Sequence, residues 1–121
     1  MVEEIAGLLG QVSVETARLQ AVLPYATPAM SNMALQVLEG QKGLLDPQKL
    51  QWLTLDEGSV PLTHEQRLQL HTMRAQWIGV AQEHLKTLRM AADSIVQQFQ
   101  MMQQFQLDMQ RQFTEFLKRQ W

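Results

Sequence analysis

The chain has 121 residues and not a single cysteine. Without cysteine there is no disulfide, no thiolate zinc or iron–sulfur site and no catalytic thiol. The absence fits a reducing compartment, where disulfides are rare. A chain of this length buries enough surface to do without such cross-links, so we expect one domain built around a hydrophobic core.

Long apolar runs are also missing. No stretch approaches the roughly 18 consecutive apolar residues of a membrane-spanning helix. The first residues, Met1 to Glu4, are acidic, whereas a secretory signal peptide starts with positive charge. We therefore expect a soluble, cytoplasmic protein.

The chain also lacks an excess of basic residues, since its net charge is −2. Binding of nucleic acid requires a basic surface, so we expect no nucleic-acid partner. The charge is unevenly placed: residues 1–63 carry seven acids and three bases, and residues 64–121 carry five acids and seven bases. These halves, at −4 and +2, predict attraction within one chain or between two chains.

No segment alternates like a β-strand, and the apolar residues follow a helical period instead. The first helix is predicted to end at Pro24 and shows one apolar stripe, formed by Ile5, Leu8, Leu9, Val12, Leu19, Val22 and Leu23. Thr27-Pro28 and Asp46-Pro47 are each a capping residue followed by proline, which is typical of a helix start. They predict one helix from residue 28 to Gly40 and another from 47 to about Leu53. We expect Trp52 to anchor the latter in the core.

A long helix is predicted for the rest of the chain. Thr63 and Gln66 form a capping box, and no proline follows up to Trp121. Its apolar residues alternate in steps of three and four over more than five heptads, with Gln106 as the one polar member. The a and d positions are Ile78, Ala81, Leu85, Leu88, Ala92, Ile95, Phe99, Met102, Gln106, Met109, Phe113 and Phe116.

The length of this helix raises two alternatives. A continuous helix of 58 residues spans about 87 Å, whereas a compact domain of this size has a radius of gyration near ~14 Å. Either the chain folds back as a hairpin near Ala91–Ser94, or another chain covers the apolar stripe. We favour the continuous helix, because the heptad phase passes through these residues without glycine or proline.

Glutamine marks the last part of the helix. Of 19 glutamines, eight lie between Gln97 and Gln112, and five of the eight aromatic residues follow position 98. Three interpretations of the segment Gln97–Trp121 are open: a bundle helix with solvated glutamines, a partner-binding helix or assembly seam, and a helix adsorbed to a lipid surface. The lipid alternative is the weakest, because the polar face is rich in glutamine rather than lysine and arginine.

The three histidines are the candidates for metal binding or phosphotransfer. His64, His71 and His84 lack the i+3 or i+4 spacing of a helical metal site, so we expect no metal and no cofactor. His84 and Lys86 resemble part of the His-x-x-Lys core of histidine phosphotransfer domains. However, the lysine comes one residue early, and Thr87 and Leu88 replace the small residues of that family. A phosphotransfer module using His84 is the last alternative, and we expect no enzyme.

Taken together, the sequence predicts an all-α helical bundle, with short helices and loops in residues 1–62 and a long coiled-coil-like helix, or a helical hairpin, in residues 63–121. The function that fits best is a non-enzymatic interaction factor: an adaptor, a chaperone-like protein or an inhibitor. We expect it to bind a protein partner or itself, most simply as a homodimer. A lipid- or granule-surface protein is the alternative. The predicted seam comprises Leu85, Leu88, Ile95, Phe99, Met102, Gln106, Met109, Phe113 and Phe116.

Overall fold

A computed structural model describes residues 1–120, and these residues form helices and loops with no strand among them. The elements are α1 (Val2–Val22), a 3-10 turn η1 (Leu23–Tyr25), α2 (Pro28–Gly40), α3 (Pro47–Leu53) and α4 (His64–Gln120). The predicted all-α fold, with short N-terminal helices and one long C-terminal helix, is confirmed. Trp121, which belongs to the segment singled out above, lies outside the described residues.

The predicted helix starts are present with their caps. The Thr27 hydroxyl accepts a hydrogen bond from the Met30 amide at 3.3 Å, and the Asp46 carboxylate accepts one from the Gln48 amide at 3.2 Å. Each cap satisfies an amide that has no partner inside the first turn. Both helices therefore begin at the proline that follows the cap.

The capping box at the start of α4 closes in both directions. The Gln66 amide donates to the Thr63 hydroxyl at 3.1 Å, and the Thr63 amide donates to the Gln66 side-chain oxygen at 2.9 Å. Two otherwise unpaired amides are satisfied by this exchange. The start of the long helix is thus fixed by four consecutive residues.

Helix α4 runs for 57 residues without a break. Around Ala91–Ser94, where a hairpin would turn, Ala92 is buried and Asp93 pairs with Arg18 of α1. The small alanine side chain lets neighbouring helices pack closely against α4, and it does not interrupt the hydrogen-bond ladder. At 1.5 Å per residue the helix is about 86 Å long.

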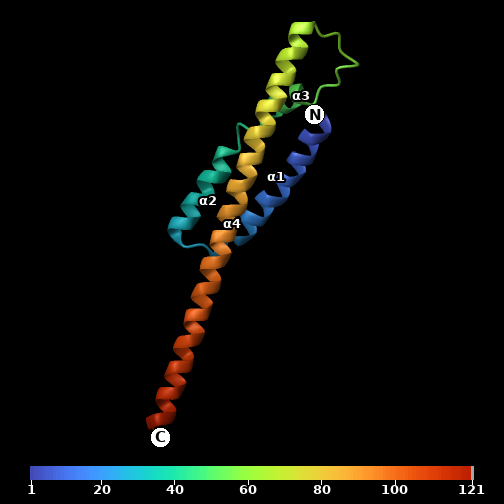
Figure 1. Cartoon of the computed structure of the whole chain (residues 1–121). Helices are drawn as coiled ribbons and strands as arrows, with labels where there is room; N and C mark the ends of the chain where they lie inside the picture. Colours follow the sequence, from blue (N-terminus) through green and yellow to red (C-terminus); the bar gives the residue numbers. More distant parts are fainter. Residues whose placement is uncertain (121) are drawn as a thin grey trace.

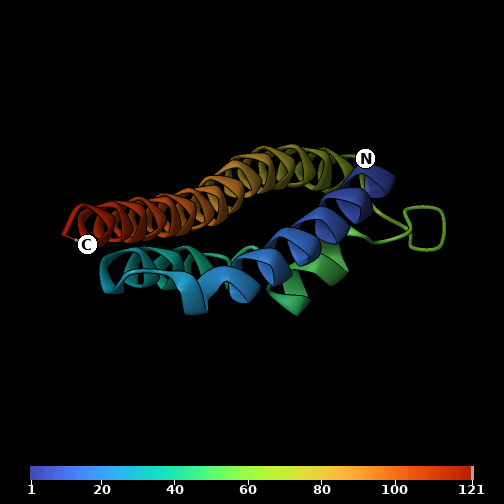
Figure 2. The ribbon, with the colours of Figure 1, turned by 90° about the horizontal axis from the view of Figure 1, so that it is seen from below.

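The shorter helices flank only the first part of α4. Figure 1 shows α1 descending beside α4 in the same direction, while α2 runs the opposite way on the other flank. Figure 2 shows that α1 and α2 both lie on one side of α4. The last part of α4 projects beyond both helices, so this part has no covering layer within the chain.

One hydrophobic core joins these elements. The apolar stripe of α1 is buried, or partly buried, along its whole length, as predicted. Helix α2 contributes only Ala34 as a fully buried residue, and the neighbouring Met33 is exposed. The fully buried residues of the cluster are Ile5, Leu8, Val12, Leu19, Ala34, Leu44, Leu53, Trp77, Ala81, Leu85, Leu88, Ala92 and Ile95.

The tryptophan that anchors the core is Trp77 and not Trp52, so that prediction was wrong. Helix α3 has only two turns and buries Leu53, which leaves Trp52 on the adjacent, half-buried side. Trp77 is buried on α4, and its indole N–H donates to the Leu44 carbonyl at 3.0 Å. A buried indole needs such a partner, and the loop before α3 provides it.

Ion pairs link the two differently charged halves within one chain. Arg89 of α4 donates to Glu15 of α1 at 3.3 Å, and Arg74 of α4 pairs with Glu57 at 3.0 Å. A third pair joins Arg18 to Asp93, and this hydrogen bond raises the pKa of the Arg18 guanidinium above its usual value. The two solvent-accessible pairs, Arg89–Glu15 and Arg18–Asp93, are each worth at most about 1 kcal/mol, so they orient α1 on α4 more than they stabilise it. The guanidinium of Arg74 is buried and belongs to a different class of pair.

Candidate interaction surface

The nine predicted seam residues fall into two groups along α4. Leu85, Leu88 and Ile95 are buried, with at most 3% of each side chain exposed, and they belong to the chain's own core. From Phe99 onward the same heptad pattern continues, but α1 and α2 no longer cover it. Phe99 itself is half-buried, and the positions left open are Met102, Gln106, Met109, Phe113 and Phe116.

Phe99 marks the edge of the bundle. Its ring is half-buried and lies against Tyr25 of η1, with ring centroids 4.8 Å apart and planes tilted by 57°. This geometry is favourable for two aromatic rings. Coverage of the stripe by the same chain therefore ends at this ring pair.

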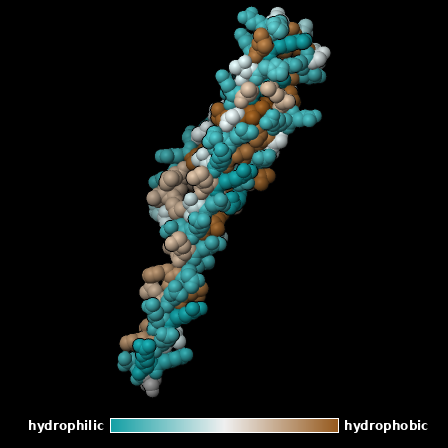
Figure 3. Space-filling model, in the orientation of Figure 1, coloured by the Kyte–Doolittle hydropathy of each residue, from teal (hydrophilic) through white to brown (hydrophobic). Residues whose placement is uncertain are grey.

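Beyond the edge, every described residue from 101 to 120 is exposed. The apolar residues at the a, d, e and g positions lie on one side of the helix, and we call them the tail stripe: Met102, Phe105, Met109, Phe113, Phe116 and Leu117. Between 40% and 64% of each of these residues is exposed. Figure 3 shows hydrophobic patches on the projecting part of the molecule, separated by hydrophilic ones. Soluble monomers seldom leave such a row of large side chains in water.

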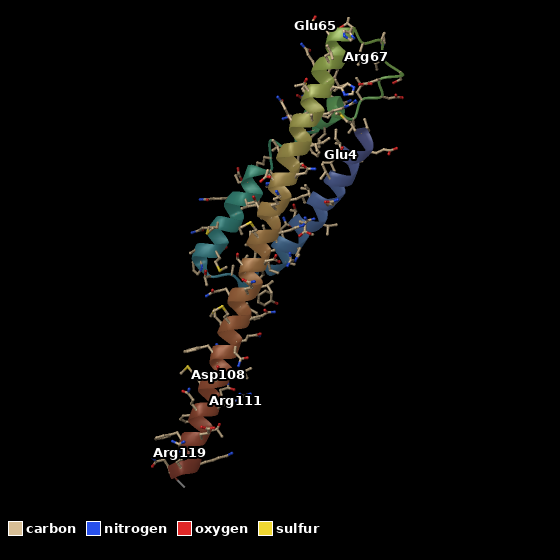
Figure 4. All side chains as sticks on the ribbon, viewed as in Figure 1. Glu4, Glu65, Arg67, Asp108, Arg111 and Arg119 are labelled. Carbon is tan, nitrogen blue, oxygen red and sulfur yellow. The ribbon has the colours of Figure 1, made fainter. Side chains whose placement is uncertain are left out.

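The charged residues of the tail avoid this side. Asp108, Arg111, Glu115 and Lys118 occupy c and f positions, away from the seam, and only Arg119 stands at a g position. Figure 4 labels Asp108, Arg111 and Arg119 on the projecting helix. From 96 to 117 the positions beside the stripe are glutamine or apolar residues, so the stripe has neutral borders.

A second apolar surface lies between α2 and α4. It is a groove of about 660 Å³ whose walls include Met30, Met33 and Val37 of α2 and Met90 and Ala91 of α4. Its lining contains no ionisable side chain. The groove can therefore hold apolar groups, but it offers no acid or base.

His84 takes part in a polar cluster at the junction of three elements. Its Nε2 atom lies 3.0 Å from the Gln41 side-chain oxygen, which also accepts a hydrogen bond from the Thr16 hydroxyl at 3.1 Å. Partial burial lowers the pKa of the His84 imidazole from its ordinary value of 6.5. The histidine therefore joins α4 to α1 and to the residue after α2.

Arg74 was not singled out from the sequence, yet it is the one charged residue among those fully buried in residues 1–120. Its guanidinium donates to the Leu53 carbonyl at 2.8 Å, to the Leu55 carbonyl at 2.9 Å and to Glu57 at 3.0 Å. A signal for it was present: the heptad register extended back from Ile78 places Arg74 at a d position. A charged residue at a core position needs a buried partner.

Metal ligands and membrane-spanning segments are two further features to consider in residues 1–120. No three His, Asp or Glu side chains gather in an arrangement that would hold a metal ion. No helix in the same range has the length and hydropathy that crossing a membrane requires.

The chain was also compared with protein-family models, curated proteins and solved structures, and nothing matches in any of the three comparisons.

Proposed function

We propose that the protein is a non-enzymatic interaction factor that self-associates through the tail stripe of α4. The observation that carries the proposal is the continuity of one heptad pattern across the edge of the bundle. Up to Ile95 the pattern is buried by α1 and α2, and after Phe99 it is bare. A second copy would cover the exposed apolar positions with a packed helix, which is how α1 and α2 cover the first half of α4.

The size of the surface supports a helical partner. Six side chains that are about half exposed offer on the order of 600 Å² per copy, taking roughly 200 Å² for each large side chain. Stable interfaces bury roughly 600–1,000 Å² per partner. The tail stripe alone reaches the lower end of that range, and its glutamine borders add to it.

The composition of the surface supports a protein rather than a lipid partner. A helix that lies on an anionic membrane carries lysine and arginine along its polar face. Here that face is mostly glutamine, and its basic residues are Arg111, Lys118 and Arg119. Glutamine accepts and donates hydrogen bonds without preferring either sign of charge.

A role without catalysis is supported by the state of the polar residues. His84 is half-buried against Gln41, and the buried Arg74 is fully engaged by two carbonyls and Glu57. Neither residue faces the apolar groove between α2 and α4. Both are explained by their structural contacts.

Light scattering on two variants tests the proposal. The wild type is expected to show twice the 13.9 kDa chain mass at about 100 µM, the range in which weak interfaces are occupied. Phe113→Asp places a charge in the middle of the tail stripe and should return the mass to one chain. Leu107→Asp is the matched control, because Leu107 is also apolar and 53% exposed but lies at a b position off the stripe.

Because Phe113 is 62% exposed, its replacement does not disturb the core of a single chain. Both variants should keep the wild-type helical circular dichroism. A mass of 13.9 kDa for the wild type at every concentration up to about 500 µM would show that the chain does not self-associate. Flotation of such a monomer with lipid vesicles would then favour the lipid-surface alternative.

A further inference from the structure

The order of a and d positions in the open part of the seam allows two identical helices to pair in opposite directions. In an antiparallel pair of helices, an a residue of one chain shares a layer with a d residue of the other. The seam positions from the half-buried Phe99 to the exposed Phe116 alternate a and d, and they pair with one another around a midpoint between residues 107 and 108. From Phe99 to Phe116 every seam position has a partner, whereas Gln120, the next a position, falls level with the buried Ile95 and pairs with no open residue.

We infer that two copies pair through α4 in antiparallel orientation, with their bundles at opposite ends. This inference rests on the proposed function and specifies its geometry. Phe99 then faces Phe116 of the second copy, Met102 faces Phe113, and Gln106 faces Met109. Each layer occurs twice because of the two-fold axis.

The bundle itself disfavours the parallel arrangement. Immediately before Phe99, the seam side of α4 is covered by the chain's own η1 and α1, with Tyr25 against the Phe99 ring. The axes of two tails packed in parallel are about 8–10 Å apart. One turn upstream, each copy would place its own covering helices, about 10 Å thick, in that same gap. In the antiparallel pair only the last turn of the partner reaches the bundle, beside Phe99 and Val96, and the partner's own covering helices lie at the far end.

The borders of the stripe suit identical copies. In an antiparallel pair of identical helices, e positions lie opposite e positions and g positions lie opposite g positions. Charged residues of one sign at these positions would therefore lie close to one another. In the antiparallel register Gln103 lies opposite Gln110, and Phe105 lies opposite Gln112. Val96, half-buried at the edge of the bundle, lies opposite Leu117, which extends the apolar contact. No pair of like charges results from these contacts.

Cysteine cross-linking decides the orientation, since the native chain contains no cysteine. Met102→Cys and Phe113→Cys proteins are mixed in a glutathione buffer, and the disulfide-linked dimers are identified by mass. The antiparallel pair predicts the mixed disulfide in at least about tenfold excess over either homodisulfide. Equivalent residues would be 11 positions apart along the axis, or about 16 Å, while a disulfide needs Cα atoms within about 7 Å.

Gln104→Cys with Arg111→Cys is the matched control. These positions have the same axial relation about the midpoint but lie at f, on the far side of the helix, so little mixed disulfide is expected. Homodisulfides in excess would show parallel pairing and overturn the inference while self-association stands. Cross-linking no greater than in the control, with the wild type still dimeric by light scattering, would overturn the register. A monomeric wild type removes the proposed function as well.

The shape of the wild-type dimer is a second measurement, and it needs no variant. An antiparallel pair centred between residues 107 and 108 has a maximum dimension of about 130 Å, whereas a parallel pair spans about 90 Å. Small-angle X-ray scattering separates these values. It decides the orientation if Phe113→Cys proves too weak to associate in reducing buffer.

Discussion

Among single residues, Arg74 is the side chain that ties α4 to the chain before it. Its three partners, the carbonyls of Leu53 and Leu55 and the carboxylate of Glu57, lie 17 to 21 residues earlier. Leu53 is the last residue of α3, where helix carbonyls lack an internal donor, and Leu55 lies in the loop that follows. Arg74 therefore closes α3 and holds the following loop against the long helix.

Replacement of Arg74 by alanine is expected to lower the free energy of unfolding by about 3–5 kcal/mol, because a buried pair loses one member and two carbonyls lose their donor. Urea unfolding followed by circular dichroism measures the change. Arg67→Ala, on the same helix but exposed, serves as the control and should stay within about 0.5 kcal/mol of wild type. Equal midpoints for the two variants would contradict the role given to Arg74.

His84 is a residue whose surroundings oppose its charge. Burial lowers its pKa from 6.5, so the neutral form is favoured in the folded protein. Above the pKa of the unfolded chain, His84 is neutral in both states and does not affect the free energy of unfolding. As the pH falls below that pKa, the unfolded chain binds a proton that the folded protein resists, so the folded protein is destabilised.

The urea midpoint should therefore be flat above pH 6.5 and decline as the pH is lowered from 6.5 through the folded pKa of His84. In His84→Gln this part of the decline should disappear. His71→Gln, at an exposed position on the same helix, should keep the wild-type profile. If the His84 variant retained the decline, the titrating group would lie elsewhere.

Among the elements, α4 is one helix with two environments. Its first half rests on α1, α2 and α3, whereas residues 101–120 are all exposed and the end of the helix projects beyond the other elements. Isolated helices of about 20 residues are only marginally stable in water, because packing supplies most of the stability of a helix in a protein. The exposed half should therefore depend on association for its order.

Native hydrogen exchange tests this dependence. At about 5 µM, amides of residues 101–119 should exchange at least about 100-fold faster than those of residues 77–95, because only the latter are held by the core. Raising the protein to about 500 µM should protect the tail by mass action. Protection equal to that of the core at both concentrations would mean that the tail is stable without a partner.

In the molecule as a whole, residues of the acidic first half form ion pairs with basic residues of the second half of the same chain. Glu15 with Arg89 and Glu57 with Arg74 pair the acidic and basic halves inside one chain. The projecting tail has neutral borders along its stripe. Association is therefore expected to depend on apolar burial and not on attraction between oppositely charged halves.

The dissociation constant of the dimer should change less than about threefold between about 0.05 M and 0.5 M NaCl, because screening over this range weakens exposed charge pairs but not apolar contacts. Analytical ultracentrifugation at both salt concentrations measures it. A tenfold or greater weakening at high salt would point to pairing through the charged surfaces. Leu107→Asp should behave as wild type in the same experiment.

The sequence by itself determined the local structure. Caps at Thr27, Asp46 and Thr63 act over two or three residues, and the heptad period acts over three or four, so both can be read from neighbours in the chain. These signals placed all four α-helices. The core role expected of Trp52 was wrong because burial in a short helix depends on which side meets α4.

Only the tertiary structure decided which part of the stripe is a core and which part is a surface. Ile95 and Phe113 belong to one heptad pattern, yet the first is buried and the second exposed, because α1 and α2 do not extend along the projecting part of α4. The contact of His84 with Gln41 spans 43 residues and has no local signal. Periodicity states that a face is apolar, whereas long-range packing determines whether the same chain covers it.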